Sequence, residues 1–277
     1  MPSADDSALP LRHAILLGLL QGPTELLPVS SSAHTELLPW LARWPYARLD
    51  GERRKAFEVA LHAGAALALA VHMRSELAHD TRNMDASHAS AVALSLAPPA
   101  LVGFALERPI ERLLGGPRSI AAGLVAGAAA MALADRGPGW REPGELGARD
   151  GLALGLAQAA ALMPGVSRNG ATLTAARARR FKRGAAHTLS WHAGLPVLFG
   201  ASALKGARLR HAGLDKREHV ALAFGGASAL VSTLVSARVL DRRLRAGRSL
   251  LPWSLYRCLL AALVLARLRG DATRTPS

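Results

Sequence analysis

The sequence predicts an all-α integral membrane protein with six transmembrane helices and two re-entrant helical hairpins, arranged as an inverted-topology repeat. Three observations lead to this fold class: six long apolar runs, two shorter apolar segments broken by polar residues, and a likeness between the two halves of the chain. Of the 277 residues, 50% are hydrophobic. Clustering into long runs is typical of transmembrane helices, because about 20 apolar residues cross the hydrocarbon core.

The six apolar runs carry few or no charges and are 16 to 20 residues long. They cover residues 56–73, 89–106, 119–134, 185–204, 220–237 and 250–266. A soluble, alanine-rich helical protein would instead show charged stripes at helical spacing within these runs. The runs largely lack such stripes, so each is interpreted as a membrane-spanning helix.

The formal net charge of +14 invites a nucleic-acid interpretation, but Arg and Lys lie mostly in the connectors between apolar runs. Cations in such connectors are typical of helix ends at anionic headgroups. Aromatic residues make up only 4% of the chain, too few for a base-stacking surface. We therefore expect no nucleic-acid partner. The single cysteine, Cys258, excludes an intrachain disulfide and a multi-thiolate metal site.

Two apolar segments are too short to cross a bilayer and contain polar interruptions. The first covers residues 13–20 and is followed by QGPTE (21–25) and then by a proline and three serines. The second covers residues 151–163 and is broken by Pro-Gly and the polar run SRNG (167–170). Segments of this kind are typical of re-entrant hairpins, which enter and leave the membrane on one side.

The two broken segments resemble each other. LGLLQ (17–21) matches LGLAQ (154–158) at an offset of 137, and LHAG (61–64) matches WHAG (191–194) at an offset of 130. This predicts one membrane domain, 1–277, built from halves 11–134 and 151–268, each with one hairpin and three spans. Three spans per half invert the second copy, and such repeats place polar sites near the bilayer midplane, where the broken segments meet. Chance similarity between low-complexity stretches is the alternative.

The first broken segment, QGPTELLPVSSSAH, concentrates polar side chains at membrane depth, where burying them without a role is costly. Glu25 can act as a general base, orient a histidine or ligate a divalent cation such as Mg²⁺ or Ca²⁺. His34 can be a nucleophile or a general acid and base. A serine hydroxyl can attack phosphorus, or it can cap a half-helix or hold phosphate oxygens. The three serines are Ser30, Ser31 and Ser32.

The second broken segment supplies PGVSRNGAT (164–172). Ser167 and Asn169 offer hydrogen bonds, and Arg168 offers a charged fork that matches phosphate oxygens. An interfacial anchor is the alternative role for Arg168.

Glu58 and His62 form a second tier of candidates, because four-residue spacing puts them on one helix face. A helix-end role for Glu58 and a buried neutral state for His62 are equally good explanations. Arg257, alone in the last apolar run, calls for a partner, or its head group reaches the membrane surface instead; a structural role is favoured over a functional one.

The paired motifs QGPTELLPVSSSAH and LMPGVSRNGAT resemble the undecaprenyl-diphosphate phosphatase family of the bacitracin-resistance type. The likeness covers nearly the whole chain. Weaker supporting matches are FEVALHAGA (57–65), GLPVLFGASAL (194–204) and LPWSLYRCLLAALV (251–264).

The resemblance implies a multi-pass protein of the bacterial cytoplasmic membrane that hydrolyses undecaprenyl diphosphate to undecaprenyl phosphate and phosphate. That reaction recycles the lipid carrier for peptidoglycan synthesis, cell-wall biogenesis and cell shape, and it confers bacitracin resistance. The site is expected to face the outer side of the cytoplasmic membrane, and a homo-oligomer is one expected state of assembly. The expected catalytic residues are Glu25, Ser31, His34 and Arg168, with a divalent cation at Glu25. The expected substrate-binding residues are Gln21, Ser30, Ser32, Ser167, Asn169, Gly170 and Thr172.

Four positions depart from the family pattern. Gln21 stands where the family often has Glu, and Asn169 stands where it commonly has Ser. His62 replaces a usual Gln, and Thr188 occupies an acidic position of the family. The departures at positions 21 and 188 remove negative charge and so affect the expected cation site.

Two other functions fit parts of the sequence. A lipid flippase would share the inverted repeat and the broken helices without cleaving its substrate. A lipid phosphatase of the acid-phosphatase type would need a downstream histidine with an acidic partner, and His187 and His192 have no nearby carboxylate in the sequence.

Overall fold

The computed structural model describes residues 9–209 and 213–272, and these residues fold into helices without a β-strand. One isolated bridge joins Arg141 to Phe181. The α-helices are α1 (Leu11–Leu26), α2 (Ser31–Ala42), α3 (Gly51–His72), α4 (Arg74–Arg82), α5 (Ala86–Leu114), α6 (Pro117–Asp135), α7 (Ala148–Ala160), α8 (Arg168–Ala178), α9 (Arg183–Leu209), α10 (Lys216–Arg245) and α11 (Leu251–Ala272). Two short 3₁₀ helices cover Pro45–Arg48 and Pro143–Glu145. The all-α prediction is confirmed.

The chain forms two compact units that are not contiguous in sequence. Unit 1 contains α1, most of α2, α3, the second part of α9 from Leu195 and α10 up to Asp241. Unit 2 contains the loop 27–33, residues 78–194 and the chain from Arg242 onward. Each unit therefore draws residues from both halves of the predicted repeat.

Small residues set the helix packing in unit 1. A Cβ on Gly18 would overlap the carbonyl oxygen of Gly225 in α10, and one on Gly64 of α3 would overlap that of Gly226. Ser232 of α10 also donates a hydrogen bond to the Leu19 carbonyl at 2.5 Å. Close approach through small residues and polar links is how helices associate in lipid, where burial of apolar surface gives little driving force.

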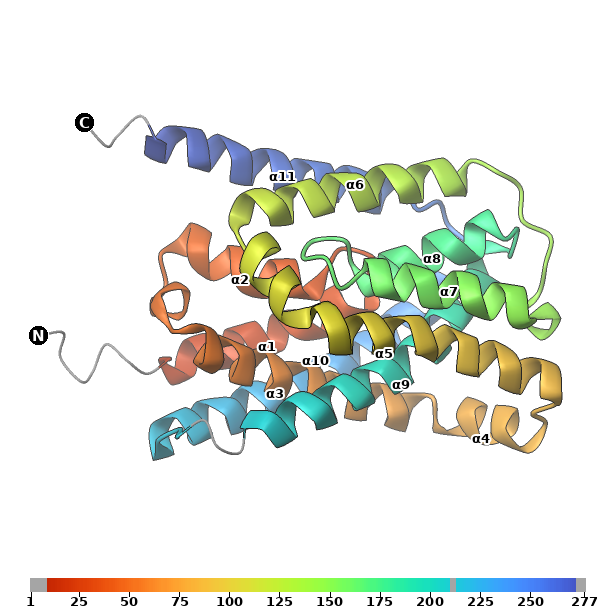
Figure 1. Ribbon diagram of the computed structural model, residues 1–277, viewed down its shortest axis with the longest axis horizontal. Coiled ribbons are helices and arrows are strands. Elements are labelled where there is room, and N and C mark those ends of the chain that lie inside the picture. Colours follow the sequence, from red (N-terminus) through yellow and green to blue (C-terminus); the bar gives the residue numbers. More distant parts are fainter. Residues whose placement is uncertain (1–8, 210–212, 273–277) are drawn as a thin grey trace, which may run out of the picture. The chain divides into compact units, whose positions relative to one another are not determined.

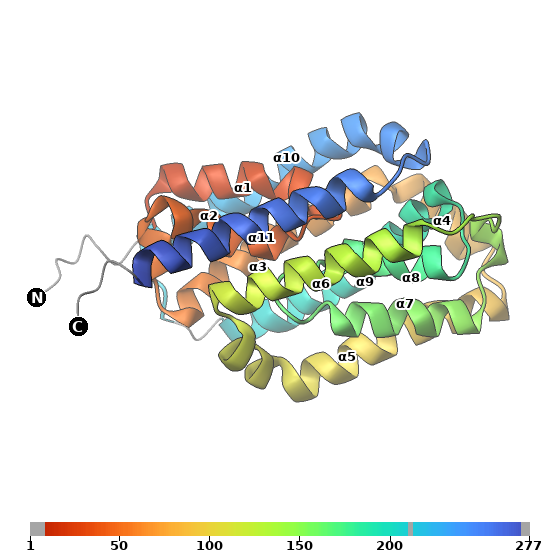
Figure 2. The ribbon, with the colours of Figure 1, turned by 90° about the horizontal axis from the view of Figure 1, so that it is seen from above.

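In unit 2, α5 packs along α7, α6 packs along α11, and α8 contacts both α6 and α7. Figures 1 and 2 show both long pairings from two directions. Glycines again allow the contact, since a Cβ on Gly151 or Gly155 of α7 would overlap backbone carbonyls of α5.

Two buried aspartates tie the ends of the helices in unit 2. Asp135, at the end of α6, accepts hydrogen bonds from Arg177 at 3.1 Å, from Arg183 at 2.8 Å and from the Leu250 N–H at 3.0 Å. Asp150, in the first turn of α7, forms the second cluster, in which it accepts hydrogen bonds from Arg141 and Arg179.

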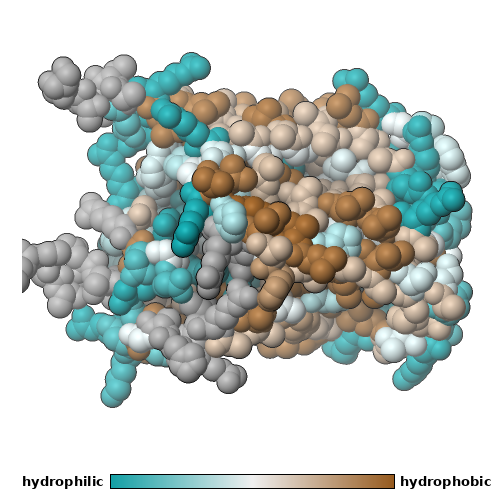
Figure 3. Space-filling view, in the orientation of Figure 1, coloured by the Kyte–Doolittle hydropathy of each residue, from teal (hydrophilic) through white to brown (hydrophobic). Residues whose placement is uncertain are grey.

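Within residues 9–209 and 213–272, four helices are long and apolar enough to cross a membrane: α5 over Ala86–Leu106, α6, α10 and α11. The count rises to five if α3 and α4, which meet at a 67° bend, form one broken span. Large apolar side chains on these helices face outward; Phe104 is 81% exposed. Figure 3 shows apolar side chains along the helices and hydrophilic ones towards their ends. These features make the chain a multi-pass membrane protein.

Five of the six predicted spans fall on these helices, and the sixth stays a prediction. Runs 89–106, 119–134, 220–237 and 250–266 fall on α5, α6, α10 and α11, and run 56–73 falls on α3. The run 185–204 lies within the continuous helix α9, which is not among the four or five. Both broken segments are helix–loop–helix elements, α1–α2 and α7–α8.

Candidate functional site

Glu25 lies in the last turn of α1, buried in unit 1 with 6% of its surface exposed. Its Oε2 accepts a hydrogen bond from Gln21 Nε2 at 3.1 Å and lies 3.6 Å from His62 Nε2. His62 Nδ1 is 2.9 Å from the Glu58 carbonyl oxygen. When Nδ1–H donates to that carbonyl, Nε2 faces Glu25. Nε2 is then an acceptor in the neutral imidazole and a donor in the imidazolium. The second-tier residue His62 therefore belongs beside Glu25, whereas Glu58 contributes its backbone carbonyl.

The surroundings of Glu25 fit a hard divalent cation only when the substrate supplies ligands. The described residues hold no group of three or more His, Cys, Asp or Glu side chains that could bind a metal ion. Gln21 Oε1, however, is buried and has no hydrogen-bond partner in the part of the chain that the structure describes. One carboxylate, one amide oxygen and phosphate oxygens make a ligand set of the kind that Mg²⁺ uses.

The serines begin α2. Ser30 has a φ of 73°, and its Oγ accepts from the Ala33 N–H at 3.4 Å and lies 3.4 Å from Ser32 Oγ. Ser31 and Ser32 occupy the first turn and are partly exposed, while His34 is buried one turn further on. The first turn of a helix presents N–H groups and a positive dipole end, which suits phosphate oxygens.

The second broken segment repeats this arrangement at the start of α8. Ser167 has a φ of 67° and caps the helix, since its Oγ accepts from the Gly170 N–H at 3.1 Å. Asn169 and Thr172 are buried in a network with Ser190 of α9. Ser190 Oγ donates to Asn169 Oδ1 at 2.6 Å and lies 2.5 Å from Thr172 Oγ1. This network fixes α8 against α9.

Arg168 is the partly exposed residue between two buried ones, Ser167 and Asn169. Its guanidinium lies against α9 at Gly194, where a Cβ would overlap Arg168 Nη1. Glycine at position 194 therefore makes room for the arginine. A planar guanidinium fork is suited to bind phosphate oxygens.

Arg257 of α11 supports the loop between α7 and α8, which leads to Ser167 and Arg168. It is fully buried, and its Nη2 donates to the Gly165 carbonyl at 3.0 Å and to the Val166 carbonyl at 2.8 Å. Its Nε and Nη1 are buried and make no hydrogen bond to any other described residue. The expectation that Arg257 has a partner is confirmed, and the alternative that its head group reaches the membrane surface is wrong, because the guanidinium is buried. Gly127 of α6 leaves the space that the guanidinium occupies.

His192 has an acidic partner that the sequence did not reveal. Its Nδ1 lies 2.9 Å from Oδ2 of Asp80, which is far away in the chain. The expectation that His192 lacks a carboxylate is therefore wrong. No pattern in the sequence links a residue of α4 to one of α9, since only the packing of unit 2 brings them together.

The structure places the predicted residues in two groups. Gln21, Glu25 and His62 come together in unit 1, while Ser167, Arg168, Asn169 and Thr172 come together in unit 2. The serine loop 27–33 belongs to the same unit as Arg168. The contact between the two groups stays a prediction.

Comparison with known proteins gives one consistent result. Residues 14–263 match the family model described as bacitracin resistance protein BacA. A protein named undecaprenyl-diphosphatase from Geobacter sulfurreducens is 38% identical over 271 residues, covering 93% of this chain and 98% of the relative. Proteins with the same name from Thermomicrobium roseum and Moorella thermoacetica are 38% and 35% identical, covering 84% and 92% of this chain and 89% and 96% of the relatives.

Proposed function

The chain belongs to the family of the bacitracin resistance protein BacA, and from this premise we propose that it is an undecaprenyl-diphosphatase. It hydrolyses undecaprenyl diphosphate to undecaprenyl phosphate and inorganic phosphate. The observation that carries the proposal is the match of this chain, along nearly its full length, to relatives that bear this name. The enzyme is a phosphatase of the membrane, and its partner is the polyprenyl diphosphate lipid.

We further propose that it lies in the bacterial cytoplasmic membrane with six spans, α3, α5, α6, α9, α10 and α11, and that α1–α2 and α7–α8 are the re-entrant hairpins. The α9 helix is 27 residues long, enough to cross the hydrocarbon core despite its polar residues. The lengths of α1 and α7, 16 and 13 residues, suit half-spans.

The two hairpins meet at the diphosphate in this proposal. The assignment of the loop 27–33 to the unit that contains Arg168 supports it. The first turns of α2 and α8 then present N–H groups and Arg168 presents its fork to the phosphate oxygens. Preorganised donors of this kind stabilise the charge that develops on the transferred phosphoryl group.

Glu25 is proposed as the general base or the cation ligand. Gln21 and His62 hold its carboxylate, so it is oriented before substrate arrives. Three nucleophiles remain open: the Ser31 hydroxyl, the His34 imidazole and a water molecule. In each case the nucleophile forms a bond to the terminal phosphorus as the anhydride bond breaks and undecaprenyl phosphate leaves. Attack by water gives inorganic phosphate directly, whereas attack by Ser31 or His34 gives a phosphoenzyme that a water molecule then hydrolyses to inorganic phosphate.

A divalent cation, Mg²⁺ or Ca²⁺, would be held by Glu25 and the Gln21 amide oxygen together with substrate oxygens. It would neutralise charge on the diphosphate. The buried, unpartnered Gln21 Oε1 supports this site.

Phosphate release from undecaprenyl diphosphate by the purified protein in detergent tests the proposal. The wild-type protein should release phosphate, and Arg168→Ala and Glu25→Ala should each lower the rate by at least about 100-fold. Arg149→Ala, on the exposed first turn of α7, is the control and should keep the wild-type rate. No release by the wild-type protein would exclude the hydrolase and favour a flippase, while full release by either site variant would exclude that residue's role.

A further inference from the structure

Ser232 of α10 supplies a hydrogen-bond donor that α1 lacks. Its Oγ donates to the Leu19 carbonyl, within α1, at 2.5 Å. A carbonyl inside an α-helix normally accepts from the N–H four residues later. For Leu19 that residue is Pro23, which has no N–H, so the helix offers no such donor. The Ser232 hydroxyl thus replaces the donor that Pro23 removes.

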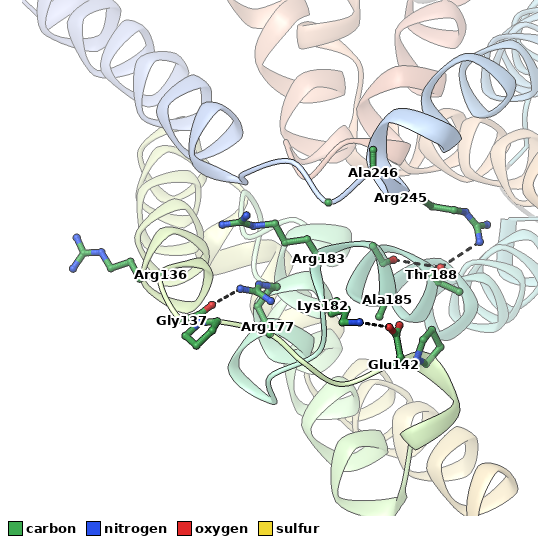
Figure 4. Close-up of a pocket in the computed structure, with 15 residues that line it drawn as sticks. Arg136, Gly137, Glu142, Arg177, Lys182, Arg183, Ala185, Thr188, Arg245 and Ala246 are labelled. Atoms are coloured by element: carbon green, nitrogen blue, oxygen red, sulfur yellow. Dashed lines mark hydrogen bonds and ion pairs between the residues drawn. The ribbon is translucent and has the colours of Figure 1, made fainter.

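The position of this bond within a helix distinguishes it from the links at helix ends. Figure 4 shows one of those links, in which Arg177 of α8 donates to the Gly137 carbonyl just after α6. The last carbonyls of a helix have no partner within the helix, and side chains of other elements can satisfy them. The Leu19 carbonyl lies roughly two turns before α1 ends at Leu26. The proline, and not the helix end, therefore accounts for its need of a donor.

The second hairpin contains the same arrangement. Pro99 of α5 frees the Ser95 carbonyl, which accepts a hydrogen bond from Gln158 Nε2 of α7 at 3.0 Å. Prolines are tolerated in the helices of membrane proteins where side chains of neighbouring helices satisfy the freed carbonyl. The first helix of each hairpin, α1 or α7, is thus tied to a long neighbouring helix at a proline.

The surroundings of the Leu19 carbonyl make the donor important. Leu16 and Leu19 are 47% and 48% exposed, so this stretch of α1 presents an apolar surface. A carbonyl without a partner is costly in apolar surroundings. Gly22 lets the donor approach, because a Cβ at this position would overlap Ser232 Oγ. The pair Gly22 and Pro23 therefore both frees the carbonyl and admits the residue that satisfies it.

The direction of the Glu25 carboxylate depends on how this part of α1 is held. Pro23 removes an N–H two residues before Glu25, and Gln21, whose Nε2 donates to Glu25 Oε2, lies in the turn that Pro23 interrupts. A helix can bend at such a proline. The bond from Ser232 to Leu19 restrains that bend and so fixes the carboxylate.

The α10 helix also holds the histidine that faces Glu25. Gly64 of α3, two residues after His62, packs against the Gly226 carbonyl of α10. Both α1 and α3 thus rest on α10, and the 3.6 Å distance from Glu25 Oε2 to His62 Nε2 depends on both contacts. Displacing a reacting group by about 1 Å reduces a rate steeply.

We propose that Ser232 is a positioning residue for the hydrolysis of the polyprenyl diphosphate, acting on Glu25 through the Leu19 carbonyl. This inference rests on the proposed function, because it assigns Ser232 a role in the same reaction. Ser232 acts on α1 and not on the substrate, so its removal should lower kcat and leave KM unchanged.

Steady-state phosphate release from undecaprenyl diphosphate tests this role in the purified full-length protein. Ser232→Ala should lower kcat by about 10-fold, with KM within about twofold of wild type. Pro23→Ala restores an N–H at position 23, which can supply the Leu19 carbonyl from within α1. In the Pro23→Ala background, Ser232→Ala should therefore change kcat by less than about twofold.

Ser228→Ala is the matched control. Ser228 lies one turn earlier on α10, and a Cβ on Gly18 of α1 would overlap its Cβ. This variant loses a hydroxyl from the same helix face and should keep the wild-type kcat. Thermal unfolding of all the variants gives a readout without substrate: Ser232→Ala should lower Tm in the wild-type background and leave it unchanged in the Pro23→Ala background.

The outcomes separate this role from general packing. An equal loss of kcat or of Tm on Ser232→Ala in both backgrounds would overturn the proposal, because the hydroxyl would then act independently of the carbonyl that Pro23 frees. Wild-type kcat in Ser232→Ala, a rise in KM alone, or an equal loss in Ser228→Ala would overturn it too. Each of these results, with phosphate release by the wild type, leaves the proposed function standing, whereas no release by the wild type overturns both.

Discussion

Ser30 and Ser167 adopt the same unusual backbone conformation 137 positions apart, with φ values of 73° and 67°. Each precedes a short helix, and each Oγ accepts a hydrogen bond from the N–H three residues later. Arg43 and Arg180 repeat the relationship after those helices, with φ values of 55° and 70°, again 137 positions apart. These four are the non-glycine residues with positive φ among those described, and their offset is that of LGLLQ and LGLAQ. This agreement supports the proposed repeat.

The conformation of Ser167 leads to a stability prediction. Ser167→Ala loses the helix cap and keeps the strained φ, so we expect a loss of about 1 kcal/mol in the free energy of unfolding. Ser167→Gly also loses the cap but adopts positive φ readily, and it should be more stable than the alanine variant. Thermal unfolding in detergent, followed by circular dichroism, measures the difference.

The same pair of substitutions at Ser30 is the matched control, because its conformation is equivalent. An alanine variant as stable as the glycine variant at both positions would show that the positive φ carries no strain.

The two loops can be predicted from the sequence, but their contacts cannot. The break between α7 and α8 follows from Pro164 and Gly165, and motif spacing placed Ser167 and Arg168 after it. The sequence gives no indication of the positive φ at Ser30 and Ser167, because glycine and asparagine are the residues that normally adopt it.

Contacts between helices are harder to predict from the sequence than the positions of the loops. Four-residue spacing put Glu58 and His62 on one face, but it could not show that His62 lies beside Glu25. That contact depends on the packing within unit 1. The buried position of Arg257 cannot be predicted for the same reason, because the space for its guanidinium is left by two glycines that are distant in the sequence, Gly127 and Gly170.

Arg257 is predicted to be a positioning residue. Its hydrogen bonds to Gly165 and Val166 fix the loop that carries Ser167 and Arg168. In Arg257→Met the loop carbonyls lose their donor, and small displacements of reacting groups reduce rates steeply. We expect kcat of phosphate release to fall by about 10-fold to 100-fold, with KM within about twofold of wild type.

Arg257→Lys restores one cationic donor of shorter reach and should recover part of kcat. A rise in KM with unchanged kcat in Arg257→Met would instead mean that Arg257 binds substrate directly, and an equal loss in the lysine variant would mean that the defect is one of folding.

Asp150 is predicted to make the fold sensitive to acid. Burial alone would raise its pKa, but the hydrogen bonds from Arg141 at 2.7 and 2.8 Å and from Arg179 at 2.7 Å outweigh burial and lower the pKa to about 2. A carboxyl with a lowered pKa stabilises the fold above its ordinary pKa and loses that contribution as the pH falls. We expect a loss of about 2 kcal/mol between roughly pH 4 and pH 2.

Thermal unfolding in detergent across this pH range tests the role of Asp150. Asp150→Asn should lower stability at neutral pH by about 3 kcal/mol, because two arginines lose their partner. Its unfolding temperature should then fall less than that of the wild type on acidification. Parallel pH curves for the two proteins would exclude Asp150 as the titrating group.

Gln21→Glu is predicted to strengthen the proposed cation site. Position 21 lies one helical turn before Glu25, and the Gln21 Nε2 now donates to Glu25 Oε2. A glutamate there would exchange that hydrogen bond for a second anionic oxygen ligand, and the two carboxylates would repel each other unless a cation lies between them. The divalent-cation concentration for half-maximal phosphate release should therefore fall by about 10-fold, and activity in the presence of a chelator should drop.

Gln158→Glu, at the matching position of the second hairpin, is the control, because Gln158 donates to the Ser95 carbonyl and not to a carboxylate. If both variants respond to the cation as the wild type does, no cation binds at Glu25, and the carboxylate acts as a base.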